Sequence, residues 1–195
     1  MVATLRQAVA GLRLLLVLTV ALGLVYPVVL YGVGRLVSGR ADGSLVEVDG
    51  VVVGSALLGQ DFEGDQWFQS RPSAAGDGYD PLASGASNLG PENPDLLAQV
   101  QERRAEVATR ESVDPADVPA DALTASGSGL DPHVSPEYAR LQVERVARVR
   151  DLPEGEVAAL VEEAVRGRDL GILGRPRVNV LELNVALQEL DGGQG

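Results

Sequence analysis

The chain contains one cluster whose residue types suit nucleophilic catalysis, a histidine between an acid and a hydroxyl. His133 lies two residues after Asp131 and two before Ser135, in L-D-P-H-V-S-P, and Ser128 precedes it in G-S-G. A serine hydrolase needs these three groups to converge in space. Residues so close in sequence, around two prolines, rarely point together, and the nucleophile motif G-x-S-x-G is missing. We therefore predict no catalytic residue, and an anchored hydrolase using His133 with Ser135 or Ser128 stays open as an alternative.

The composition removes several other chemistries. The 195 residues include no cysteine and no lysine, and His133 is the single histidine. Without cysteine there is no disulfide, thiol catalysis or iron–sulfur cluster. Without lysine there is neither a phosphate-binding P-loop nor a Schiff base. One histidine excludes a histidine-rich zinc site, and the acids between Asp61 and Asp80 lack the spacing of an EF-hand loop, so we predict no metal site.

Charge is divided unevenly along the chain. Residues 1–40 carry four arginines and no acid, whereas residues 41–195 carry 12 arginines against 28 acids, a net charge of −16. Such a surface repels the phosphates of nucleic acids and of anionic lipids. We expect no nucleic-acid partner.

An uncharged segment near the amino terminus predicts a membrane anchor. Residues 14–34 contain no ionisable charge, and as a helix these 21 residues span roughly 32 Å, enough for a hydrocarbon core of about 30 Å. Pro27 lies inside it, which membrane helices tolerate. The run is longer than the apolar region of about 7–15 residues in a cleaved signal peptide. We predict a retained transmembrane helix at about 12–34 within an N-terminal segment 1–40.

The charges flanking this helix do not decide its orientation. Two arginines precede the uncharged run and two follow it, so the positive-inside count is nearly tied. One helix without an internal ionisable group offers no ion path by itself, so it either tethers the chain or packs against other helices. Thr19 and Gly23 lie four residues apart, a spacing of small residues that allows close helix contact.

Residues 41–195 predict a single domain of mixed helices and strands, of α/β or α+β class. Val46–Leu58 is β-branched and interrupted by glycines, which predicts a hairpin, and Leu123–Leu130 is a further candidate strand. The aromatic pair at 67–68 is expected in the core. The Gly- and Pro-rich stretch 71–94 is too long for an ordinary connection and predicts an ordered functional loop.

Cap and proline signals predict four helices in this domain. They begin at Asn93-Pro94 (to about Glu111), at Ser135-Pro136 (to about Arg150), after Pro153 (to about Gly167) and after Asn179.

Several long segments, in order and at matching spacing, carry a family resemblance. They are Tyr26-Pro27, GSALLGQDF (54–62), FQSRPSA (68–74), YDPLASGASNLGPENP (79–94), VPADALTASGSGLDPHVSPE (118–137), QVERVA (142–147) and LGRPRVNVLELNVAL (173–187). Together they resemble the C subunit of the Kdp high-affinity potassium-transporting P-type ATPase, over nearly the whole chain.

The resemblance implies a single-pass protein of the bacterial plasma membrane, with a cytoplasmic amino terminus and an extracytoplasmic domain. It implies a complex with a potassium-channel-like A subunit, an ATP-hydrolysing B subunit and a small F subunit, so that ATP and potassium belong to the complex. The family subunit resembles a catalytic chaperone that raises the ATP affinity of the B subunit, and Gln142 matches a glutamine proposed to touch nucleotide. An extracytoplasmic domain cannot meet ATP bound in the cytoplasm, so these two implications conflict.

The sequence therefore predicts a non-catalytic accessory subunit that supports assembly of a potassium import complex. The residues expected at partner contacts come from the anchor and from the matched loops. They are Thr19, Gly23, Tyr26, Pro27, Arg71, Pro72, Ser87 and Asn88. A free-standing solute-binding module, with a pocket formed by 71–94, is a further alternative.

Overall fold

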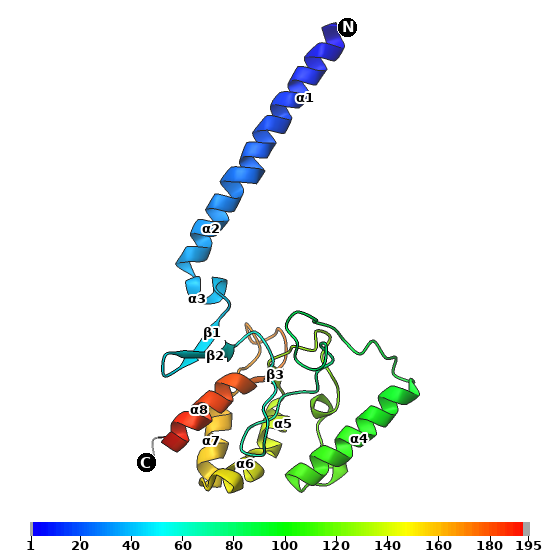
Figure 1. Cartoon of the computed structure of the whole chain (residues 1–195), viewed down its shortest axis with the longest axis vertical. Coiled ribbons are helices and arrows are strands. Elements are labelled where there is room, and N and C mark those ends of the chain that lie inside the picture. The colour runs from blue at the N-terminus through cyan, green and yellow to red at the C-terminus, as the bar shows by residue number, and fades with distance from the viewer. Residues whose placement is uncertain (1, 193–195) are drawn as a thin grey trace. The chain divides into compact units, whose positions relative to one another are not determined.

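The computed structural model describes residues 2–192, which form two units, one ending at Ser44 and one starting at Leu45 (Figure 1). The first contains one apolar helix long enough to cross a membrane, and the second is a small domain of helices and short strands. The predicted fold class is thereby confirmed.

The first unit is a helical run of 35 residues, Val2–Leu36, and none of its apolar window is buried by the rest of the chain. Pro27 has no N–H, and its ring crowds the carbonyl four residues earlier. The turn before it is correspondingly wide, since the Tyr26 N–H donates to the Ala21 carbonyl, five residues back. A π turn thus absorbs the proline without ending the helix. The elements are α1 (Val2–Val20), the π turn η1 (Ala21–Val25), α2 (Tyr26–Leu36) and the short α3 (Ser38–Ala41).

The second unit begins with the predicted hairpin. Strand β1 (Leu45–Val48) pairs antiparallel with β2 (Val51–Ser55). Both residues of the connecting turn, Asp49 and Gly50, have positive φ, 51° and 76°. Asp-Gly is a favoured pair for such a two-residue turn, because its backbone twist matches that of the flanking strands. The hairpin prediction is confirmed.

Up to residue 192, the domain also contains five helices and two 3₁₀ turns, and side-chain caps fix three of the helix starts. Asn93 accepts from the Asp95 N–H at 2.8 Å, Ser135 from the Tyr138 N–H at 3.1 Å and Asn179 from the Glu182 N–H at 3.1 Å. These starts are as predicted. The elements are α4 (Pro94–Glu111), η2 (Pro115–Asp117), η3 (Ala120–Ala122), α5 (Pro136–Leu141), α6 (Val143–Arg150), α7 (Glu154–Ala164) and α8 (Val180–Gly192).

Three predictions need correction. The helix expected to run unbroken from Ser135 is divided at Gln142 into α5 and α6. Helix α7 ends at Ala164, before the predicted glycine. The stretch Leu123–Leu130 is not a strand, because its serine side chains bond the local backbone, as in the donation from the Leu130 N–H to Ser128 Oγ.

The loop 71–94 contains no helix or strand before Pro94, where α4 begins, yet it is bonded to the stretch 126–130. Ser73 Oγ donates to the Gly129 carbonyl at 2.7 Å, and the Gly85 N–H donates to the Ser128 carbonyl at 2.9 Å. Gly129 has φ +70°, and a Cβ there would lie 2.7 Å from the Ala75 nitrogen, so this close approach of two backbones requires glycine.

The core lies among α4 to α8 and the segment before the long loop. Tyr138, Leu183 and Phe68 are among its fully buried side chains, which confirms the core prediction for Phe68. Trp67 is only half-buried and is covered by the Arg150 guanidinium, 4.2 Å from the ring centroid. Two further strands, β3 (His133–Val134) and β4 (Val178–Asn179), pair antiparallel.

A buried ion pair joins α4 and α6. Arg145 Nε lies 3.0 and 2.9 Å from the two Glu111 carboxylate oxygens, and both side chains are almost fully excluded from water. Arg145 also donates to the Trp67 carbonyl at 3.0 Å and to the Asp65 carbonyl. Burial raises the pKa of Glu111, although the hydrogen bond and charge of Arg145 oppose this. One guanidinium therefore links two helices to the segment 65–67.

We expect Arg145→Met to lower the free energy of unfolding by about 3–5 kcal/mol, because it leaves the Glu111 carboxylate buried without a partner. The measurement is urea unfolding of the full chain in detergent, followed by Trp67 fluorescence. Arg148→Met, on the exposed side of the same helix, is the matched control, with an expected change within about 0.5 kcal/mol. Equal unfolding midpoints for the two variants would show that the buried pair is not needed.

Candidate functional site

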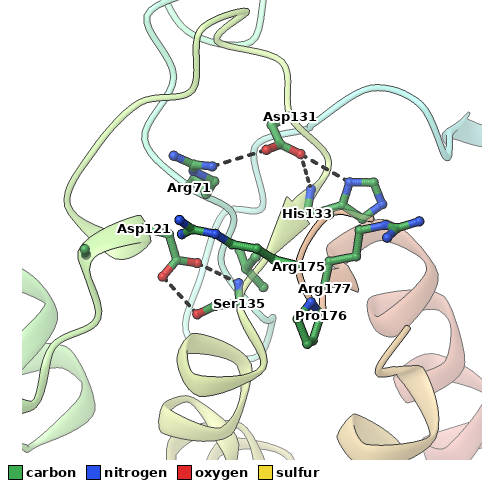
Figure 2. A pocket seen from close by; sticks show the side chains of 11 residues that line it. Arg71, Asp121, Asp131, His133, Ser135, Arg175, Pro176 and Arg177 are labelled. Carbon is green, nitrogen blue, oxygen red and sulfur yellow. Dashed lines mark hydrogen bonds and ion pairs between the residues drawn. The ribbon is translucent and has the colours of Figure 1, made fainter. Parts of the chain in front are cut away.

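The candidate catalytic residues Asp131, His133 and Ser135 line an open cleft of about 480 Å³ (Figure 2). It lies between β3, the turn η3, the start of the long loop and the segment before β4. The lining residues are Arg71, Ala120, Asp121, Asp131, His133, Val134, Ser135, Gly174, Arg175, Pro176 and Arg177. Three arginines give this cleft a basic wall within a strongly acidic domain.

Asp131 is the central polar group of the cleft. Its Oδ2 lies 3.2 Å from Arg71 Nη1, and its Oδ1 accepts from the His133 N–H at 3.0 Å and lies 3.2 Å from His133 Nδ1. Burial acts to raise the pKa of Asp131, but the hydrogen bonds from His133 and the charges of His133 and Arg71 outweigh it, so the pKa is lowered. Asp131 therefore stays ionised and orients both neighbours.

Ser135 is engaged elsewhere. Its Oγ donates to Asp121 Oδ1 at 2.9 Å, its N–H donates to Asp121 Oδ2 at 2.6 Å, and its Oγ caps α5. Figure 2 shows Asp131 facing Arg71 and His133, while Ser135 turns to Asp121. The structure brings His133 to Asp131, but the Ser135 hydroxyl donates its hydrogen bond to a different carboxylate, that of Asp121. This is the arrangement of a helix cap and not of a catalytic triad.

Metal ligation finds no support in the part of the chain that the structure describes. Among residues 2–192, no three side chains of His, Cys, Asp or Glu converge in a geometry that could hold a metal ion.

Gln142, which the resemblance connected with nucleotide, is fully buried. Its Oε1 accepts from the Gln69 N–H at 2.6 Å and from Arg145 Nη2 at 2.9 Å, and its Nε2 donates to the Gln69 carbonyl at 3.2 Å. In this conformation the amide is satisfied by the chain itself, so the side chain presents no surface to a nucleotide. Nucleotide contact by Gln142 stays a prediction.

A second buried amide, that of Asn184, bonds the backbone of Phe68 as Gln142 bonds the backbone of Gln69. Asn184 Oδ1 accepts from the Phe68 N–H, and Asn184 Nδ2 donates to the Phe68 carbonyl, both at 2.9 Å. Sequence reasoning missed Asn184. The signal for it was an asparagine among apolar residues on the inward face of the last helix, where a buried amide requires hydrogen-bond partners.

The predicted partner-contact residues are divided between the two units. Thr19, Gly23, Tyr26 and Pro27 are exposed on the helix of the first unit. In the domain, Arg71 belongs to the basic cleft and Pro72 lines a second, smaller cavity of about 250 Å³. Ser87 and Asn88 are exposed in the long loop.

Tyr79 fixes the loop beside that second cavity. Its hydroxyl donates to the Arg71 carbonyl, and its N–H donates to Ser73 Oγ at 2.8 Å. Burial, together with the charge of Asp61, raises the pKa of Tyr79 to about 12. The phenol therefore stays protonated and acts as a structural donor at neutral pH.

The chain matches known proteins over almost its whole length. A family model described as K⁺-transporting ATPase, c chain (KdpC), matches residues 8–189. A relative from Kineococcus radiotolerans is 68% identical over 184 residues, which cover 94% of this chain and 94% of that protein. Relatives from Xanthomonas oryzae pv. oryzae (51% identical, covering 96% and 90%) and Streptomyces coelicolor (48% identical, covering 95% and 93%) also match. All three are named potassium-transporting ATPase KdpC subunit.

We expect Asp131→Asn to flatten the acid limb of the stability profile. Because the pKa of Asp131 is lowered by folding, the unfolded chain binds more protons between that pKa and the ordinary value of 3.8. The stabilisation is complete above this window and is lost as the pH falls through it. Urea unfolding of the full chain between about pH 2.5 and 4.5 measures the slope, and the variant should give a shallower one.

The slope between about pH 5 and 7 is the internal control, because Asp131 remains ionised there in both states. Identical acid slopes for parent and variant would contradict the interpretation of Asp131 as an ionised centre of the cleft.

Proposed function

The chain belongs to the KdpC family, the c chain of the K⁺-transporting ATPase, and we propose that it is a non-catalytic accessory subunit of an ATP-driven, high-affinity potassium import complex. The observation that carries the non-catalytic part is the cleft geometry. The candidate nucleophile Ser135 is a helix cap bonded to Asp121, and His133 is bonded to Asp131 instead. The contribution of this subunit to transport is therefore to assemble and stabilise the other subunits.

The partners proposed for this subunit are the potassium-channel-like A subunit, the ATP-hydrolysing B subunit and the small F subunit. The helix Val2–Leu36 supports helix–helix contacts with them, because no apolar side chain of it is buried within this chain. Gly23 has open space where a Cβ would be, so another helix could approach its backbone closely. Thr19, Tyr26 and Pro27 lie exposed on the same helical run.

We place the amino terminus in the cytoplasm and the domain outside it, beside the outer entrance of the ion-conducting subunit. The family resemblance supports this orientation. An acidic domain near an entrance would raise the local cation concentration through its field, although salt at about 0.15 M screens such a field within about 8 Å.

Any effect on the ATP affinity of the hydrolytic subunit is proposed to be transmitted through subunit contacts. One observation and one consequence of the proposed orientation support an indirect route. Gln142 is fully buried, and both polar atoms of its amide are bonded to Gln69 or Arg145. An extracytoplasmic domain would also lie across the membrane from cytoplasmic ATP.

Co-expression with the A, B and F subunits tests the subunit role. With an affinity tag on the A subunit, we expect this chain to be retained through purification in mild detergent. A variant in which the segment before residue 41 is replaced by a cleavable signal peptide is the control, and its retention should fall because the helical contacts are gone. A full-length chain that runs alone would contradict the proposal.

Photoaffinity labelling with an azido-ATP tests the indirect route in the assembled complex. We expect the label on the ATP-hydrolysing subunit and none on this chain, and we expect Gln142→Glu, which keeps the side-chain size, to leave the labelling pattern unchanged. Label on this chain that disappears in Gln142→Ala would instead establish direct nucleotide contact.

A further inference from the structure

One segment of the domain has a form that potassium transport does not explain. Residues 166–177, here called the finger, connect α7 to β4 as a narrow paired loop. Arg166 and Arg177 exchange backbone hydrogen bonds at 2.8 and 2.9 Å, and Asp169 and Leu173 exchange two more at 2.9 Å. Arg177 Nη2 also lies 3.3 Å from both carboxylate oxygens of Asp169. The finger is therefore held in shape by its own contacts.

Its tip is apolar and bare. Leu170 is 89% exposed, Ile172 75% and Leu173 56%. Leu170 has φ +55°, a left-handed conformation that costs a residue with a side chain roughly 1–2 kcal/mol. No burial within the domain compensates this cost, because the side chain points into solvent. A strained, exposed leucine at the end of a pre-formed loop is typical of a contact made with something outside the chain.

The base of the finger is basic, in contrast to the rest of the domain. Four of the 12 arginines that follow residue 40 lie in these 12 residues, with Asp169 as the single acid. Arg175 and Arg177 also line the basic cleft together with Arg71 and His133 (Figure 2). The finger thus combines an apolar end with a cationic collar, and the general repulsion of phosphates by the acidic domain does not apply here.

The spacing of these two parts matches a lipid interface. The apolar tip lies two to four residues beyond the arginines at 168, 175 and 177. At no more than about 3.3 Å per residue, the extended rise, tip and collar lie at most roughly 7–13 Å apart. Apolar faces of interfacial segments enter about 5–10 Å into the boundary between headgroups and acyl chains, which leaves the arginines at the depth of the phosphates.

A second group of exposed apolar side chains lies beside the finger, on the β1–β2 hairpin and the turn after it. Asn179, which follows the finger, donates to the Ala56 carbonyl at 2.8 Å, so the finger and the end of the β1–β2 hairpin are neighbours. Figure 1 shows the orange segment between α7 and α8 at the same end of the domain as that hairpin. The hairpin and the turn after it expose Leu45, Val51, Val52, Val53, Leu57 and Leu58.

The connection between the anchor and the domain is short. Only Asp42–Ser44 separate α3 from Leu45, and a fully extended chain of that length spans at most roughly 14 Å. Leu45, the first residue of the hairpin, therefore lies within that distance of Ala41 whatever the orientation of the domain.

We propose that the finger docks on the phospholipid bilayer, with Leu170, Ile172 and Leu173 inserted among the acyl chains and the arginines at its base bound to headgroup phosphates. The domain is then held to the membrane at two points, the anchor and the finger. The apolar centre flanked by arginines, its spacing and the short tether all favour a lipid surface over a groove on another protein.

Because the chain contains no cysteine, single cysteines can report the position of the finger. Ile172→Cys carries the probe bimane on the tip, and Leu82→Cys, 96% exposed in the long loop, is the matched control. The complex is reconstituted in phosphatidylcholine nanodiscs with and without doxyl-labelled lipid. We expect the bimane at 172 to shift to the blue and to be quenched by doxyl lipid but not by aqueous iodide, with the opposite quenching at 82.

The arginine collar has its own test in the same nanodiscs. Adding phosphatidylglycerol should raise the docked fraction, and Arg168→Ser or Arg175→Ser should lower the docking constant by roughly fivefold each. Both arginines are exposed, and an unchanged thermal midpoint controls for folding.

Two results would overturn the proposal. Quenching at 172 by iodide and not by doxyl lipid would place the finger in water, and protection from both quenchers would place it inside another subunit. If the complex does not assemble, the subunit role fails separately, and the full-length chain alone in nanodiscs still decides the position of the finger by the same two quenchers.

Discussion

An uncharged helix that nothing in its own chain covers is the constraint on which the rest depends. Residues 14–34 carry no charge, and the window of highest hydropathy in Val2–Leu36 is not buried at all. In water this surface would be strongly unfavourable, whereas a bilayer accepts it because a helix satisfies its own backbone. The π turn before Pro27 shows the same adaptation locally, since it removes the one interruption that could have ended the helix. A membrane-bound subunit of a potassium-transporting ATPase follows from this segment together with the family.

In the domain, the buried polar side chains and the candidate catalytic residues make structural hydrogen bonds and ion pairs. Gln142 and Asn184 bind the backbone of residues 69 and 68, and Arg145 links Glu111 to the same segment. These polar side chains are buried and fully paired, which fixes one arrangement of the segment against the helices. Ser135 and His133 are likewise bound to separate carboxylates. These polar groups therefore hold the fold together, and the arginines of the basic cleft and the finger belong to a domain whose net charge is −16.

Local signals predicted much of this fold. Asn93 with Pro94, Ser135 and Asn179 each mark a helix start, because a cap acts within three residues. Contacts between residues far apart in the sequence could not be predicted. The break at Gln142 lies where its amide bonds Gln69, 73 residues earlier in sequence, and Asn184 bonds Phe68 across 116 residues. In the site, the short sequence separation of Asp131 and His133 indicated that they could pair. The basic cleft could not be predicted, because Arg71 and Arg175 come together only through tertiary packing.

The most direct test of the account is the intact mass of the chain recovered from carbonate-washed membranes. If the apolar helix is a retained anchor, the membrane fraction should contain a polypeptide whose mass includes residues 2–40. A soluble product shortened by cleavage near residue 40 would contradict the account, because neither subunit packing through the helix nor the short tether of the finger would then exist.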